Sequence, residues 1–349
     1  MLSALTYCCV FLANFLIPMV GVKLLLLIST IMISLGLVLS GLATHVWHLY
    51  LSCSLCCGIG ISLMYGVIIG VLPQWFVKKR STVFGFQSSM LSATALIFPF
   101  IITVSNDTLG IVWMYRILGL AFFALNAVAI LLIKERPSDN NITPLRRKKK
   151  ILDTAVLKNK TLVVWTIAGP IFSWCQYITY TFLPQYATYL GLSTTESSAT
   201  ITVFAATSII GRVVMGLLAD RLGNLNTYIV FTTIASLLIL FHWMFAYDLA
   251  SLISFAIVYG LFSGGHYALA SPITVAIAGL PMYPAATSFR MLAYCFGIVG
   301  PTIASTIEEA TNGKPYLCYK LFAGFALLIC VILACIVRHH LSKKVCDKI

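Results

Sequence analysis

The feature that most restricts the fold of this chain is a series of apolar stretches, each about 20 residues long, the length that crosses a bilayer as a helix. Hydrocarbon offers no hydrogen-bond partners, so a backbone inside it must satisfy its own N–H and C=O groups, as an α-helix does. Only 9% of the 349 residues are charged, whereas a soluble domain has roughly a quarter. We therefore predict an all-α polytopic membrane protein with about eleven transmembrane helices, at residues 2–20, 24–43, 49–73, 82–104, 110–133, 161–187, 197–219, 225–246, 250–278, 283–306 and 316–337.

The connections between these spans alternate in charge. Basic residues gather in the connections on one side, at Lys23, Lys78 to Arg80, the segment 134–160, Arg221 and the tail from Arg338. The remaining connections carry one basic residue, Lys314, and the acids Asp107, Glu196, Asp248, Glu308 and Glu309. Because Lys and Arg are retained on the cytoplasmic side of a membrane, the basic side is predicted to be cytoplasmic.

The segment 134–160 is the only long polar connection and predicts the domain division. It separates an N-terminal bundle at 1–133 with five spans from a C-terminal bundle at 161–338 with six, followed by a cytoplasmic tail at 339–349. Its basic run at 146–150 could bind anionic lipid headgroups at about 1 kcal/mol per residue. The alternative is a solvated linker that only helps to set the orientation.

One stretch in the second half carries a recognisable pattern. Residues 208–226 form an apolar helix that contains Arg212 and ends in Gly216-x-x-x-Asp220-Arg221-x-Gly223-Asn224. We expect Asp220 to cap the next helix and accept from Arg221, and the glycines to permit close approach and a turn. With Gly211, these residues form a predicted gate on the cytoplasmic side.

This pattern resembles the inter-helix signature of the major facilitator superfamily. Gln74-Trp75-Phe76-x-Lys78-Lys79-Arg80 and the residues 183–193 are similar to segments of its monocarboxylate-transporter family, in particular the fungal type. The resemblance implies the major facilitator fold in two bundles and symport of a small organic anion by alternating access. It also places the first span at the family's second helix, so that the family's first helix has no counterpart here.

Arg212 is the only charge that we place well inside a span of the second half, about 12 Å before Asp220 at 1.5 Å per residue. A buried arginine is costly unless it is paired or faces water, and its planar fork suits a carboxylate. The resemblance implies an arginine in the solute site here. The alternative is that Arg212 braces helices or reaches the cytoplasmic face. In many family members a carboxylate lies one turn earlier, where this chain has Ser208, and serine does not titrate near neutral pH.

His266, after Gly264 and Gly265, is a second candidate, since a histidine that lines a cavity titrates near neutral pH. A hydrogen-bonded core histidine is the alternative. Five further side chains are expected to face the cavity if the superfamily arrangement holds, with ordinary packing as the alternative for each: Tyr177, Tyr180, Phe204, Tyr65 and Gln87.

Nothing in the sequence indicates an enzyme, a cofactor or nucleic-acid binding, because no nucleophile set, phosphate-binding glycine loop or metal-ligand spacing occurs. Cys53, Cys56 and Cys57 lack an accompanying histidine or acid, and we interpret them as small apolar packing residues. The preferred function is a carrier in the plasma membrane, with a vacuolar or other internal membrane as the alternative location. The rival function is a truncated relative that does not transport and acts as a regulatory or sensor protein.

The orientation can be checked directly. Since the basic connections are predicted to be cytoplasmic, a tag placed before Met1 should be accessible on intact cells and a tag placed after Ile349 should not. Antibody labelling before and after permeabilisation measures this. Labelling of the C-terminal tag on intact cells would overturn the predicted orientation.

Overall fold

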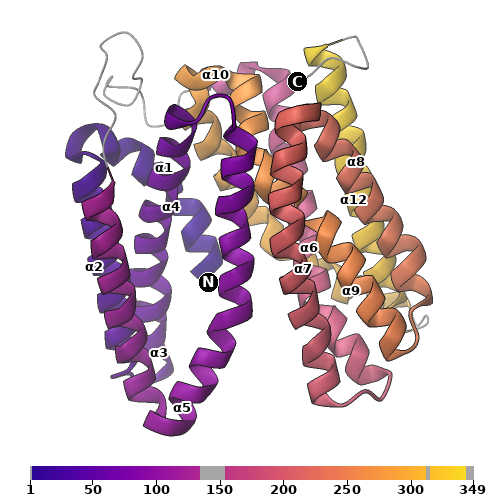
Figure 1. The fold of residues 1–349 in the computed structure, drawn as a ribbon, viewed down its shortest axis with the longest axis horizontal. Helices are drawn as coiled ribbons and strands as arrows, with labels where there is room; N and C mark the ends of the chain where they lie inside the picture. The colour runs from indigo at the N-terminus through magenta and orange to yellow at the C-terminus, as the bar shows by residue number, and fades with distance from the viewer. Residues whose placement is uncertain (1, 134–153, 312–314, 343–349) are drawn as a thin grey trace. The chain divides into compact units, whose positions relative to one another are not determined.

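A computed structural model describes residues 2–133, 154–311 and 315–342, and within them the chain is built from helices (Figure 1). Two π-helical turns (η1, η4) and three 3₁₀ segments (η3, η5, η6) lie between or beside the α-helices. In chain order the elements are α1 (Leu2–Val20), α2 (Val22–Ser40), α3 (Val46–Leu49), η1 (Tyr50–Cys56), α4 (Cys57–Trp75), α5 (Arg80–Leu132), η3 (Thr154–Lys158), α6 (Lys160–Tyr189), α7 (Thr194–Leu222), α8 (Asn224–Leu237), η4 (Leu238–His242), η5 (Trp243–Phe245), α9 (Leu249–Ser263), α10 (Gly265–Tyr294), η6 (Cys295–Val299), α11 (Gly300–Thr311) and α12 (Leu317–Leu341).

These elements confirm the predicted fold class. The described residues contain nine helical stretches that are long and apolar enough to cross a membrane. Two of them, Arg80–Leu132 and Leu249–Thr311, are 53 and 63 residues long, far more than the ~20 residues that one crossing needs. Each turns at a glycine with positive φ, Gly110 at 78° and Gly279 at 71°, so each provides two crossings. The nine helical stretches of the described residues therefore give eleven crossings, the predicted number. The predicted connection at 105–109 is helical, and the chain turns at Gly110 instead.

Contacts divide the chain into two units that do not follow the sequence order. Unit 1 comprises residues 1–75, 97–156 and 278–295, and unit 2 comprises 76–96, 157–277 and 296–349. The helices α5 and α10 are therefore each shared, because one part packs in each unit. The division at 134–160 stays a prediction, and the basic run at 146–150 lies outside the described residues.

Unit 1 is held together by α1, α2 and α4, with α4 packed along both of the others (Figure 1). Its apolar core includes Ala13, Leu25 and Leu63. The thiols of Cys56 and Cys57 donate to backbone carbonyls of α2, at 3.1 and 3.5 Å. These cysteines lie where α2 contacts the end of η1 and the start of α4, as expected for packing residues.

The second half of α10 runs along α1 within unit 1. The Asn14 amide donates to the Pro284 carbonyl at 3.0 Å and to the Ser288 hydroxyl at 2.8 Å. Further along, the rings of Tyr7 and Tyr294 stack at 5.5 Å between centroids. The two helices therefore run antiparallel, since the contact moves backward along α10 as it moves forward along α1.

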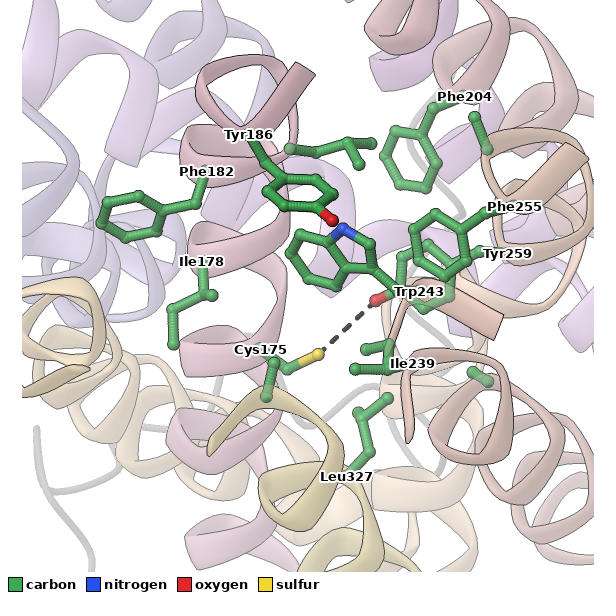
Figure 2. Close-up of a cluster of buried hydrophobic side chains, with 14 of the residues drawn as sticks. Cys175, Ile178, Phe182, Tyr186, Phe204, Ile239, Trp243, Phe255, Tyr259 and Leu327 are labelled. Carbon is green, nitrogen blue, oxygen red and sulfur yellow. Dashed lines mark hydrogen bonds between the residues drawn. The ribbon is translucent and has the colours of Figure 1, made fainter. Parts of the chain in front are cut away.

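Unit 2 contains a core of aromatic side chains (Figure 2). Phe255 stacks between Trp243 and Tyr259, with ring centroids 5.5 and 5.1 Å apart. The Tyr186 hydroxyl donates to the Ala246 carbonyl at 2.8 Å and so ties α6 to the end of η5. Around this core α7 packs along α9, and α12 packs along α6 and α8 (Figure 1).

Acidic side chains mark the starts of several helices in unit 2. Glu196 and Ser193 form a capping box at α7, in which the carboxylate accepts from the Ser193 N–H at 2.9 Å. At α9, the Asp248 carboxylate accepts from the Ser251 hydroxyl at 2.6 Å. The Glu308 carboxylate of α11 accepts from the N–H groups of Tyr316 and, at 3.0 Å, Cys318 at the start of α12. A negative charge at these positions interacts favourably with the positive end of the helix dipole.

The cap on α12 gives a stability prediction. Glu308→Gln removes the charge and one of the two acceptors, so it should lower the free energy of unfolding by about 1 kcal/mol. The matched control is Glu309→Gln, because Glu309 is the adjacent acid and is exposed. Melting temperatures of the two purified variants in detergent measure the difference. Equal melting temperatures would show that the Glu308 carboxylate does not stabilise α12.

Candidate functional site

The helix α7 carries Arg212, and both of its ends are defined by the local sequence. It begins at the Ser193–Glu196 capping box and ends at Gly223, whose φ of 99° suits glycine rather than residues with a side chain. The next helix, α8, begins at once with Asn224. The predicted turn between two helices at 208–226 is therefore formed by a single glycine.

Asp220 caps a different helix from the one predicted. Its Oδ1 accepts from the Ser81 N–H at 3.0 Å, and its Oδ2 accepts from the Thr82 N–H at 2.8 Å and the Thr82 hydroxyl at 2.6 Å. These donors lie at the start of α5, whereas α8 has no side-chain cap. The expectation that Asp220 caps the following helix was wrong, because α5 presents its unpaired N–H groups to the same carboxylate. The Ser81 hydroxyl also donates to Asn224 at 2.5 Å.

Glycines allow α5 and α7 to approach at backbone distance. A Cβ on Gly216 would lie 2.5 Å from the Ser81 carbonyl oxygen, and one on Gly85 would lie 2.6 Å from the Arg212 carbonyl oxygen. Gly211 has the same role toward α9, where a Cβ would overlap the Leu261 backbone. Of the predicted gate residues, Gly216 therefore serves the contact of α7 with α5, and Gly211 serves the contact of α7 with α9.

Arg212 reaches into the same contact from α7. Its side chain is 4% exposed. Its Nη1 donates to the Ser88 carbonyl of α5 at 2.7 Å, and the guanidinium carbon lies 5.3 Å from the Tyr267 ring centroid. A side chain at Gly264 would overlap the stem of Arg212. The Nε–H group has no hydrogen-bond partner among the described residues, so the guanidinium retains an unused donor.

Ser208 lies one turn before Arg212 and is fully buried. Its hydroxyl oxygen accepts from the Ser92 hydroxyl at 3.3 Å. This position therefore adds a neutral hydrogen bond between α7 and α5, next to the Arg212–Ser88 bond. No titratable group stands one turn before the guanidinium.

Two of the predicted aromatic residues lie near this contact. Tyr180 on α6 packs edge to face on Phe204 at 5.0 Å, and its hydroxyl is close enough to the Arg212 charge to interact with it electrostatically. Phe204 is fully buried and stacks on Tyr259 at 5.5 Å within the aromatic core (Figure 2). Tyr180 thus packs on the edge of the aromatic core.

The other predicted residues are placed separately. Tyr177 is half-buried one turn before Tyr180 on α6, and Gln87 is half-buried on α5 beside Ser88. Tyr65 lies on α4 in unit 1. The contacts therefore join Tyr180 with Phe204 in unit 2, whereas Tyr65 belongs to another unit.

His266 lies inside a set of aromatic rings. It is fully buried, its ring stacks on Phe172 at 4.7 Å and lies 5.4 Å from Trp165. Its Nδ1 is 3.2 Å from the Tyr228 hydroxyl. These contacts favour the alternative of a hydrogen-bonded core histidine.

Two further cations are buried among the described residues. The prediction that Arg212 is the only charge well inside a span of the second half was wrong, because Arg290 and Lys320 are 1% and 4% exposed. Lys320 Nζ lies 3.7 Å from the Tyr186 ring centroid, and 5.9 Å from that of Trp243. Both residues lie seven or fewer positions after the start of a predicted span. A charge near the end of a span is usually solvated, so neither residue was predicted to be buried.

A family model described as the Major Facilitator Superfamily matches residues 2–301 and 186–345 of the chain. An MFS-type transporter of Gibberella moniliformis is 25% identical over 328 residues, which cover 93% of this chain and 77% of that protein. In Saccharomyces cerevisiae, the riboflavin transporter MCH5 is 26% identical over 345 residues, covering 92% of this chain and 65% of the relative. The uncharacterized transporter ESBP6 of the same yeast is 27% identical over 349 residues, and the match spans 95% of this chain and 52% of ESBP6.

Solved structures show the same fold. The fucose:proton symporter FucP of E. coli superposes with a TM-score of 0.77 at 15% identity, covering 96% of this chain and 89% of FucP. The human organic anion transporter MFSD10 gives a TM-score of 0.73 at 15% identity, with 95% and 82% covered.

The bond between Asp220 and the start of α5 gives a prediction for hydrogen exchange. Asp220→Asn removes the charge and one acceptor, which should cost about 1 kcal/mol at this cap. Exchange of the Ser81 and Thr82 amides should then be about fivefold faster. Exchange mass spectrometry measures this, with Asp107→Asn, an exposed acid on the same helix, as the control. Unchanged exchange at residues 81 and 82 would refute the cap.

Proposed function

Because the chain belongs to the Major Facilitator Superfamily and is therefore an integral multi-pass secondary transporter rather than an enzyme, we propose that its solute is a small organic anion of the monocarboxylate type. The observation that carries this proposal is the buried Arg212 guanidinium with its unused Nε donor. The resemblance of residues 74–80 and 183–193 to the monocarboxylate-transporter family supports it.

The chemistry of Arg212 favours an anion with a planar carboxylate. One N–H is taken by the Ser88 carbonyl, which neutralises no charge. A guanidinium in a low-dielectric site is stabilised most by a group that is both negative and able to accept two parallel hydrogen bonds. Tyr180 places a phenol within electrostatic reach of the same charge, and it is the second residue that we assign to solute binding. We assign Tyr177 and Gln87 to the same site because Tyr177 lies one turn before Tyr180 and Gln87 is adjacent to Ser88.

The gate is proposed at the α5–α7 contact. Alternating access in this fold proceeds by movement of one repeat against the other. The Asp220 carboxylate and the backbone contact at Gly85 and Gly216 are short-range interactions that separate as a set. We propose that they hold the cytoplasmic side closed in one state, with 1–133 and 161–338 as the moving bundles and the plasma membrane as the location.

Coupling to protons by a carboxylate beside Arg212 is not part of the proposal, because Ser208 occupies that position and hydrogen-bonds Ser92. Uptake should therefore depend on external pH only as far as ionisation of the solute does.

The test is uptake with variants of Arg212. Arg212→Lys keeps the charge but loses the fork, and Arg212→Ala loses both. Breaking a buried charge pair typically costs about 2–5 kcal/mol, so the apparent affinity should fall on the order of thirtyfold or more. The assay is saturable uptake of radiolabelled short-chain monocarboxylates by cells whose own carriers are deleted. Riboflavin belongs in the panel, since a relative is named for its transport.

Arg116→Ala is the matched control, because Arg116 is also an arginine on an aromatic ring, 5.2 Å from the Trp113 centroid, but lies in unit 1. Melting temperatures distinguish a variant with lower affinity for the solute from a variant that is unstable because it lacks the Arg212–Ser88 hydrogen bond. Saturable carboxylate uptake that Arg212→Ala leaves unchanged would refute the site. Absence of uptake of every solute by well-inserted protein would favour the regulatory or sensor alternative.

A further inference from the structure

Two cysteine side chains that are remote in sequence lie against each other in unit 1. The Sγ of Cys8, on α1, is 3.2 Å from the Sγ of Cys295, the first residue of η6, 287 positions later. Both side chains are partly exposed. The Cys295 thiol is also 3.7 Å from the Ala4 carbonyl, one turn earlier on α1.

The surrounding contacts hold this pair in register. The adjacent residues Tyr7 and Tyr294 stack at 5.5 Å, and Asn14 donates to Ser288 at 2.8 Å further along the same two helices. A disulfide requires ~2.05 Å between the sulfurs, so closing the gap needs a movement of about 1 Å. Rotation of the two side chains, which need not disturb the helices, supplies a movement of this size.

We propose that Cys8 and Cys295 form a reversible disulfide that fastens α1 to the second half of α10 and stops the transport cycle. The reaction is thiol–disulfide exchange with an external disulfide such as oxidised glutathione. The first thiolate attacks a glutathione sulfur and releases one glutathione thiolate. The second thiolate then attacks the mixed disulfide and releases the other. Two protein thiols lose two electrons and two protons, and one external disulfide becomes two thiols.

In the predicted orientation, Cys8 lies in the non-cytoplasmic half of the first span, and Cys295 lies near the middle of the predicted span 283–306. Leu2 begins α1 on the non-cytoplasmic side, and Cys8 follows six residues later, about 9 Å along the helix. Disulfides persist on that side of a cell membrane, where thiols are not kept reduced.

The consequence for transport follows from where the two helices come from. α1 belongs to the first half of the sequence, and the segment 278–295 belongs to the second half although it packs in unit 1. Movement of one repeat against the other requires such contacts to change, and a covalent bond does not permit them to separate. This part of the inference rests on the proposed transport activity, whereas bond formation does not.

The first experiment detects the bond. The full-length protein in detergent is treated with oxidised glutathione, blocked with an alkylating reagent and digested without reduction, and linked peptides are identified by mass spectrometry. A peptide joining Cys8 to Cys295 is expected in the original chain and in Cys9→Ser, and not in Cys8→Ser or Cys295→Ser. Cys9 is the matched control, since it is the adjacent and partly exposed thiol. Absence of this peptide from folded protein, or linkage through Cys9 instead, would overturn the proposal.

The second experiment measures the effect. Oxidation should raise the melting temperature, and uptake should fall in proportion to the fraction of chains that carry the bond. Dithiothreitol should reverse both changes, and neither should occur in Cys8→Ser or Cys295→Ser. Full uptake by cross-linked protein would overturn the arrest. A reduced protein that transports no carboxylate would count against the proposed solute alone, because the linked peptide and the melting shift are still measured.

Discussion

Every helix leaves its first N–H groups without partners in the helix, and a chain inside a bilayer has little water with which to satisfy them. Four of the six acidic residues that the structure describes lie where a helix begins: Glu196 at α7, Asp248 at α9, Glu308 at α12 and Asp220 at α5. Three of these caps are local or join neighbouring helices. The Asp220 cap joins residues 138 or more positions apart, and it brings α5 against α7 at backbone distance.

Two buried cations of unit 2 contact neutral groups. Among the described residues of unit 2, Arg212 bonds a backbone carbonyl and faces a tyrosine ring, and Lys320 lies over the ring of Tyr186. Carbonyl dipoles and aromatic faces stabilise a cation without cancelling its charge. The Arg212 charge that these contacts leave in place is the one to which we assign the proposed anion.

The sequence was sufficient to predict the number of crossings, the fold class and the helix pair around Gly223, because hydrophobic length and glycine position are local properties. It was not sufficient to predict the partner of Asp220, since two helix starts compete for that carboxylate and tertiary packing selects α5. Arg290 and Lys320 escaped notice because each stands near the end of a span in the sequence, where a charge is usually solvated. The core environment of His266 could not be predicted, because Phe172, Trp165 and Tyr228, which surround it, are distant in the sequence.

The exchange of α5 and α10 between the two contact units constrains the order in which the protein can assemble. During synthesis α1, α2 and α4 leave the ribosome long before residues 278–295, yet Asn14 finds its acceptors only on that later segment. The start of α5 likewise has no carboxylate on its N–H groups until Asp220 has been made. Each unit contains residues from both halves of the sequence. Both units are therefore completed only after residues of the second half have been synthesised.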